Sequence, residues 1–137
     1  MNLPASRVRW LLALLLVSAP ALAHDLVRDG NVGALLHLEP DDAPAARAPT
    51  RAWFEVNGRG AQAITLANCV CTLNVYAGRA QAGAVSTSLP RLTTEKNRLR
   101  ADLIFPVVGA YTLVLTGQPR SGASFAPFRL EWVVRAE

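Results

Sequence analysis

The segment 109–115, Gly-Ala-Tyr-Thr-Leu-Val-Leu, constrains the fold more than any other stretch of this sequence. In an extended chain Tyr111, Leu113 and Leu115 lie on one face, and the residues between them lie on the other. Gly109 stands two residues before the tyrosine, where the chain must bend. In a β-sandwich such a run forms a tyrosine corner, whose ring enters the core while its hydroxyl bonds to upstream backbone. The segment therefore predicts two β-sheets packed face to face.

The remainder of the chain repeats this period of two. The expected strands are 31–39, 51–57, 63–66, 69–76, 98–105 and 126–134, and 89–97 is ambiguous between an edge strand and a turn. Residues 24–30 are polar and predict a loose lead-in. About seven strands at short spacing, with no helical period after residue 23, predict an all-β fold. We expect an immunoglobulin-like Greek-key sandwich of one domain, 24–137, preceded by a signal-peptide helix.

The same alternation sorts the side chains into inward and outward faces. The residues expected to meet in one core are Leu36, Phe54, Leu73, Tyr111 and Trp132. His37 then lies on the polar face beside Glu39, and Trp53 points outward or toward a sheet edge. These assignments follow from the rule that successive side chains of a strand point to opposite faces.

Residues 1–23 have the pattern of a cleaved export signal. Arg7 and Arg9 precede an apolar run, 10–17, which at about eight residues is too short for a bilayer that needs roughly 20. The segment ends in Ala21-Leu22-Ala23, the small-x-small pattern that signal peptidase cuts. Cleavage after Ala23 predicts a periplasmic or secreted protein that begins at His24 and has no membrane span.

The charge balance argues against a nucleic-acid-binding groove. The whole chain has 14 basic and 10 acidic residues, which gives a net charge of +4. Removing Arg7 and Arg9 with the signal leaves 12 basic residues against 10 acidic ones, so the processed chain carries +2. The remaining charges are scattered and mixed in sign, as on an ordinary solvated surface.

His24 and His37 are the two histidines of the chain and form the first candidate metal site. A histidine at a processed N-terminus offers its α-amine and a ring nitrogen to one ion, and His37 would complete a ligand set suited to Cu(II). The alternative is that cleavage must leave some residue first, and that His37 is an ordinary surface imidazole. Two ligand residues are too few to specify a site from sequence alone.

Cys69 and Cys71 form a second, separate candidate site. Export implies an oxidising compartment, in which two thiols usually pair. On a flat strand their Cα atoms would be about 6.5–7 Å apart, so pairing is expected to need a bulge or a loop at Asn68. Three interpretations stay open: a local disulfide, buried free thiols, and a dithiolate metal or redox site. Because the cysteines face inward and His37 faces outward, the two candidate sites are not expected to merge.

No motif of catalysis is visible in the sequence. Asp41 and Asp42 lie in a proline-containing loop, but adjacent acids point apart and lack the alternating ligands of a calcium loop. No Gly-x-Ser-x-Gly elbow, glycine-rich phosphate loop or zinc-finger spacing occurs. The chain is therefore predicted not to be an enzyme. Trp53 and Tyr76 would form an interaction patch if exposed; otherwise each covers a sheet edge.

The order of these pieces resembles the YtkA-like/CopC-like group of small exported bacterial sandwich domains. The resemblance rests on Gly33–Pro40, Ala52–Val56 and Cys71–Tyr76 as three early strands, and on 105–115 as a late Phe-Pro-x-x-Gly-x-Tyr strand. It implies bacterial export and, as in CopC, copper held partly by an N-terminal histidine. The chain lacks the methionine-rich copper(I) motifs, since its one methionine is Met1.

Two functions follow as hypotheses. The first is a non-enzymatic binding or accessory domain of the cell envelope, with an envelope protein as its partner. The second is a periplasmic copper-binding protein that uses His24 with His37, or Cys69 with Cys71. Neither hypothesis involves nucleic acid.

Overall fold

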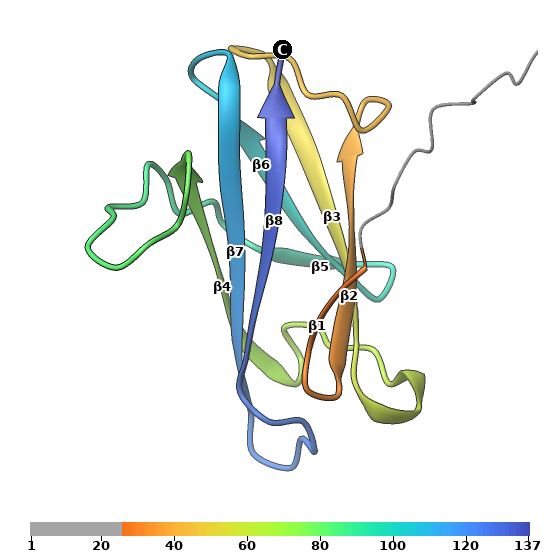
Figure 1. Ribbon diagram of the computed structural model, residues 1–137. Helices are drawn as coiled ribbons and strands as arrows, with labels where there is room; N and C mark the ends of the chain where they lie inside the picture. The colour runs from red at the N-terminus through yellow and green to blue at the C-terminus, as the bar shows by residue number, and fades with distance from the viewer. Residues whose placement is uncertain (1–25) are drawn as a thin grey trace, which may run out of the picture.

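In the computed structural model, residues 26–137 are described and form two antiparallel β-sheets packed face to face (Figure 1). The predictions of a signal peptide over 1–23, of cleavage after Ala23 and of a ligand at His24 lie outside the described residues. Within 26–137, no helix has the length and apolar character needed to cross a membrane.

Eight strands build the two sheets of the described part. The larger sheet contains, in spatial order, β1 (Val27–Asp29), β2 (Val32–Glu39), β3 (Pro49–Asn57), β6 (Arg98–Ile104) and β5 (Thr93–Glu95). The smaller sheet contains β4 (Cys69–Ala77), β7 (Gly109–Pro119) and β8 (Phe128–Ala136). The chain crosses between the sheets after β3, β4 and β6, so the predicted all-β sandwich is confirmed.

The core lies between the two sheets and contains the residues that the alternation assigned to it. All five belong to one buried cluster: Leu36, Phe54, Leu73, Tyr111 and Trp132. The rings of Phe54 and Trp132, which come from opposite sheets, have centroids 5.3 Å apart. Burial of such apolar surface contributes about 25 cal/mol per Å², which makes this layer the main source of stability.

The tyrosine corner is also confirmed. The Tyr111 hydroxyl donates to the carbonyl oxygen of Val107 at 2.7 Å and accepts from the N–H of the same residue at 3.0 Å. Its ring packs on Phe105, with centroids 4.7 Å apart. The bend before β7 is thus held by a buried ring and by two hydrogen bonds to one upstream residue.

Two local predictions are wrong. Residues 27–29, expected in a loose lead-in, pair with β2 as β1, because Gly30 at φ 57° permits a two-residue turn and Val27 contacts the core. Segment 63–66 is not a strand, and only a single bridge joins Ala63 to Asn57. The Asn68 side chain explains this, because it accepts from the Thr65 N–H at 2.9 Å and folds the segment into a turn.

Candidate functional site

His37 lies on the outward face of β2, as predicted, and is half-buried. Its direct cross-strand neighbour on β3 is Trp53. Among residues 26–137, no three or more His, Cys, Asp or Glu side chains are grouped so that they would hold a metal ion. The predicted pairing of His37 with His24 involves a residue outside the described part.

Cys69 and Cys71 are joined in a disulfide on β4. Cys69 is fully buried and Cys71 is half-buried, and their Cα atoms are 5.4 Å apart. In this state neither sulfur is a thiolate that would ligate a metal. Of the bulge or loop expected at Asn68, the loop is present, because Asn68 lies in a turn just before β4. The bulge is absent, because the pairing of β4 with β7 runs without interruption from Cys69 opposite Pro119 to Ala77 opposite Tyr111. The strand shortens locally instead of adding a residue.

The two candidate metal sites stay apart in the fold. The disulfide is in the smaller sheet, with Cys69 packed into the interior, whereas His37 is on the outer face of the larger sheet. The sequence argument that these residues would not form one site therefore agrees with the described geometry.

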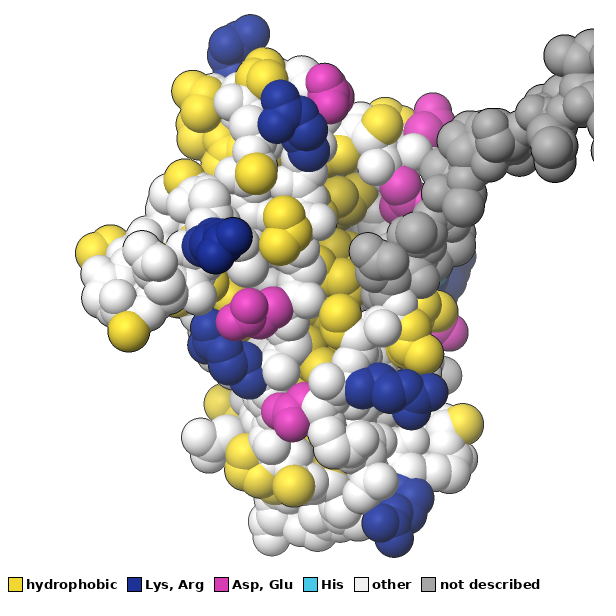
Figure 2. Space-filling view, viewed as in Figure 1, with side chains coloured by type: hydrophobic (Ala, Val, Ile, Leu, Met, Phe, Trp, Pro, Cys, Tyr) yellow, Lys and Arg dark blue, Asp and Glu magenta, His cyan; other side chains and the backbone are white. Residues whose placement is uncertain are grey.

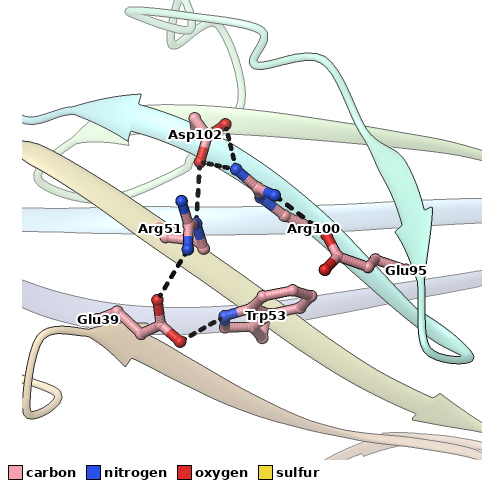
Figure 3. A network of polar contacts seen from close by, with 6 residues as sticks. All are labelled: Glu39, Arg51, Trp53, Glu95, Arg100 and Asp102. Atoms are coloured by element: carbon pink, nitrogen blue, oxygen red, sulfur yellow. Dashed lines mark hydrogen bonds and ion pairs between the residues drawn. The ribbon is translucent and has the colours of Figure 1, made fainter.

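Polar contacts cross the outer face of the larger sheet as a continuous chain, which we call the outer ladder (Figure 3). Its members are Glu39, Arg51, Trp53, Arg100, Asp102 and Glu95. The Arg51 guanidinium lies 3.4 Å from Glu39 and 3.5 Å from Asp102. The register of β3 with its two neighbours places these side chains side by side. Arg51 lies opposite Glu39 of β2 and opposite Asp102 of β6.

Trp53 is the aromatic member of the outer ladder and is covered by its charged neighbours. Its indole N–H donates to a carboxylate oxygen of Glu39 at 2.9 Å, and the Arg98 guanidinium stacks over the ring at 4.4 Å. As a result Trp53 is only 7% exposed, although it points away from the core. The condition for a surface patch of Trp53 with Tyr76 is therefore not met.

Arg100 joins the ladder to β5. Its guanidinium lies 3.0 Å from both Glu95 and Asp102. The hydrogen bonds that Arg100 donates to Glu95 and, with a smaller effect, to Asp102 raise the pKa of Arg100 above its ordinary value. Every carboxylate of the ladder thus has a cationic or N–H partner within the ladder. Such an arrangement is typical of a covering surface and not of an acid–base site, which requires a carboxyl group poised to exchange protons.

An exposed apolar surface lies where β6 ends. Four residues form it, and we call them the edge patch: Pro49, Leu89, Pro90 and Ile104. They line a hollow of about 430 Å³. Leu89 is 65% exposed and Ile104 is 57% exposed, and the exposed Val107 and Val108 follow a few residues later in the chain. The hollow is shallow and apolar, which suits a protein surface better than a small polar ligand.

The sequence analysis did not identify the edge patch. In the expected strand 98–105, the alternation places Ile104 on the same face as Arg98, Arg100 and Asp102. An isoleucine among three charged residues is the one sign of the patch that the sequence offers. Leu89 comes from a loop 15 positions earlier, and its proximity to Ile104 depends on the tertiary fold. A period-two pattern does not report such contacts.

Comparison with known proteins gives no family. No family model matches the chain, and no curated protein matches it. One solved structure with some similarity is a crystal structure of FetP from uropathogenic Escherichia coli strain F11, expressed in the periplasm of E. coli BL21(DE3). It is 11% identical, the match covers 81% of this chain and 91% of that chain, and the TM-score is 0.49. A likeness at this level carries no argument about function.

Proposed function

We propose that this chain is an exported, non-enzymatic β-sandwich module of the cell envelope that binds another protein. The observation that carries the proposal is the edge patch. Large apolar side chains that are more than half exposed and lie together are uncommon unless a partner covers them. Export is supported by the signal-like pattern of residues 1–23.

The position of the edge patch also favours a protein partner. β5 pairs with only three residues of β6, Arg98 to Arg100, so within 26–137 no strand pairs with the last part of β6 on that side and its edge is open there. An open edge beside apolar side chains offers both backbone hydrogen bonds and a hydrophobic contact. Asp102 and Arg51 flank it and supply a polar rim, as at many protein interfaces.

Photo-crosslinking in envelope preparations tests this proposal. A photoreactive amino acid at Ile104 is expected to trap one discrete partner, and the same probe at Val133, which is 73% exposed on β8, is the matched control. The double variant Leu89→Ser/Ile104→Ser should lose binding, whereas Val133→Ser should keep it. Equal crosslinking from both positions, or from neither, would contradict the proposal.

A second candidate function, Cu(II) binding in the periplasm, is favoured by the register of β1 with β2. Val27 pairs with Ala34, and each step back along β1 is one step forward along β2. Continued in that register, the residue three places before Val27, His24, would come opposite His37. Directly opposed residues of an antiparallel pair share one face, with Cβ atoms about 4.5–5.5 Å apart.

Such a pair would offer three nitrogens from this chain. His24, once processed, supplies its α-amine and one ring nitrogen, and His37 supplies another ring nitrogen from a half-buried position. Nitrogen ligands of this kind suit Cu(II) in a tetragonal arrangement. The dithiolate alternative at Cys69 and Cys71 requires the disulfide to be reduced first.

A titration of Cu(II) into protein processed to begin at His24, followed by EPR, tests the second candidate. A saturable, nitrogen-ligated signal near one equivalent is expected. It should weaken in His37→Gln and when an added residue blocks the α-amine, while the surface variant Arg135→Gln leaves it unchanged. Absence of a saturable signal would exclude the site, and a signal indifferent to His37 would remove His37 from it.

We also propose that the sandwich is immunoglobulin-like and related to the YtkA-like/CopC-like group. The strand orders β2-β3-β6-β5 and β4-β7-β8 correspond to the four-on-three arrangement of constant-type immunoglobulin sandwiches. The tyrosine corner before β7 supports the same comparison. An experimental structure of a member of the group, superposed strand by strand, would test it.

A further inference from the structure

The Cys69–Cys71 disulfide joins two residues that the smaller sheet already holds in place. Both lie on β4, and β7 pairs with them through Pro119 and Gly117. A disulfide stabilises a fold mainly by restricting the unfolded chain, and this effect grows with the length of the loop that it closes. A bridge between two residues of one strand closes a very short loop and does not connect the two sheets. Its contribution to stability is therefore expected to be small.

The two sulfur atoms of the bridge differ in access. Cys69 is fully buried, and its sulfur lies near Gly117 and Phe128, since a Cβ added at Gly117 would come within 2.8 Å of that sulfur and would overlap the ring. Cys71 is half-buried, and the residue directly opposite it on β7 is Gly117, which has no side chain to cover it. The bridge is therefore expected to be approached from the side of Cys71.

β4 is an outer strand, and its edge is open beside Cys71. In the described part its strand partner is β7 alone. On the other side the Val75 N–H donates to the Ser88 carbonyl oxygen at 3.0 Å, and the Val75 carbonyl oxygen accepts the Thr87 N–H at 2.7 Å. Backbone groups of alternate residues point to the same side of a strand, so those of Cys71 and Leu73 also point away from β7.

Within 26–137, no backbone hydrogen bond is made to Cys71 or Leu73 on that open side. The loop after β4 projects from the side of the molecule, as the protrusion on the left of Figure 2 shows, and its one bridge to β4 in the described part is at Val75. β4 has no charged side chain and no proline, which are common protections of a sheet edge. A short extended segment of another protein can therefore lie beside Cys71.

We propose that the disulfide is a thiol–disulfide exchange site at which Cys71 reacts with a dithiol protein. A thiolate of the partner attacks the Cys71 sulfur, and the bond to the Cys69 sulfur breaks. The Cys69 sulfur leaves with the bonding electron pair and takes up a proton, because apolar surroundings disfavour a thiolate. The partner's second thiol then attacks the mixed disulfide and releases Cys71 as a thiol. The partner is oxidised to a disulfide, and this chain is reduced to two thiols. The reaction requires neither the edge patch nor a metal.

Reduction of the folded wild-type protein by dithiothreitol, with EDTA present, tests the proposal. Timed samples are quenched with excess N-ethylmaleimide in urea, and the alkylated cysteines are counted by mass spectrometry. Reduction in native buffer is expected at a rate within about tenfold of the rate in urea, because Cys71 is accessible without unfolding. A native rate lower by about a thousandfold or more would show that only the unfolded chain reacts, and would overturn the proposal.

Two single-cysteine variants identify the sulfur that reacts. In native buffer, the thiol of Cys69→Ala should react with dithionitrobenzoate about tenfold faster or more than the thiol of Cys71→Ala, and the two should react alike in urea. In the wild type, the monothiol glutathione should form its mixed disulfide on Cys71, as fragment masses report, which does not depend on how the variants fold. Equal native rates, or glutathione on Cys69, would contradict the assignment of Cys71.

The stability of the reduced protein provides a further test. Oxidised and reduced wild type should unfold at nearly the same urea concentration, because the bridge closes so short a loop. A large loss of stability on reduction would show that the disulfide has a structural role and would count against an exchange site.

Discussion

The middle strands of the two sheets, β3 and β7, differ in what covers their outward faces. On β7 five consecutive residues, Tyr111 to Leu115, are buried, so the strand is enclosed on both faces. On β3 the inward residues Ala52, Phe54 and Val56 enter the core, whereas the outward Trp53 is buried only beneath the charged outer ladder. On its outward face β7 buries Thr112, which donates a hydrogen bond to the Gly78 carbonyl oxygen, whereas β3 buries Trp53 under long charged side chains.

This difference indicates where substitutions should reduce stability most and where they should reduce it least. Packed apolar surroundings have little free volume, and even one added methyl group is felt. Long charged side chains rearrange at low cost, and their ion pairs at an exposed surface are weak and screened by salt. We therefore expect substitutions on β7 to have larger effects than substitutions in the outer ladder.

The largest effect is expected for Gly117→Ala on β7. A Cβ at this position would overlap the ring of Phe128 and come within 2.8 Å of the Cys69 sulfur. The loss of unfolding free energy should be about 3 kcal/mol, as for severe overpacking. Urea denaturation measures it.

Gly33→Ala on β2 is the matched control, because a Cβ there meets nothing closer than 3.6 Å. It should leave stability nearly unchanged. Phe128→Leu combined with Gly117→Ala should recover part of the loss. If both glycine variants behave alike, overlap with Phe128 is not the cause.

Tyr111→Phe should have the next largest effect. The change removes the hydroxyl that makes both hydrogen bonds to Val107, and a loss of about 1.5 kcal/mol is expected. Tyr76→Phe serves as the control, since the Tyr76 hydroxyl has no hydrogen bond to another residue within 26–137, and its cost should be small. Equal costs for the two variants would contradict a special role for the corner.

Trp53→Phe should lower the free energy of unfolding by less, about 1 kcal/mol, because it removes the indole hydrogen bond to Glu39 and part of the buried ring. In that background Glu39→Gln should have less effect than it has in the wild type. A double-mutant cycle by urea denaturation measures this coupling. Additive effects would mean that the indole contact contributes nothing to stability.

The smallest effect is expected for Arg100→Gln, which removes two exposed ion pairs of the outer ladder. The melting temperature should fall slightly at low salt and by less at high salt. Because the pKa of Arg100 is raised, its contribution is present at every pH below the unfolded pKa and is lost only as pH rises through the folded value. A salt-independent change would indicate that packing over Trp53, and not charge, is what Arg100 supplies.

Much of the fold was predictable from period-two patterns and one corner motif. Tyr111 and Gly109 predicted the bend before β7, and the alternation placed Leu36, Phe54, Leu73 and Trp132 in one core. Val27 in a polar segment was too short a signal for a strand. The Asn68 side chain, which turns segment 63–66, acts through hydrogen bonds that no periodicity reveals.

The candidate sites were less predictable. The sequence placed His37 on the correct face. The register argument that pairs it with His24 depends on β1, which was not predicted. The cysteines were expected to need a bulge or a loop at Asn68 to pair; a turn does precede β4 there, and the strand itself keeps its register. The edge patch combines residues from distant segments and was not foreseen.

The sequence by itself determined which side of each strand is apolar, because side chains alternate at every residue of an extended chain. Only the tertiary structure decided what lies against each side: charged neighbours over Trp53, the apolar Leu89 beside Ile104, and a Phe128 ring against Gly117. The reason is that alternation is local, whereas strand order and register are set by contacts between segments far apart in the chain.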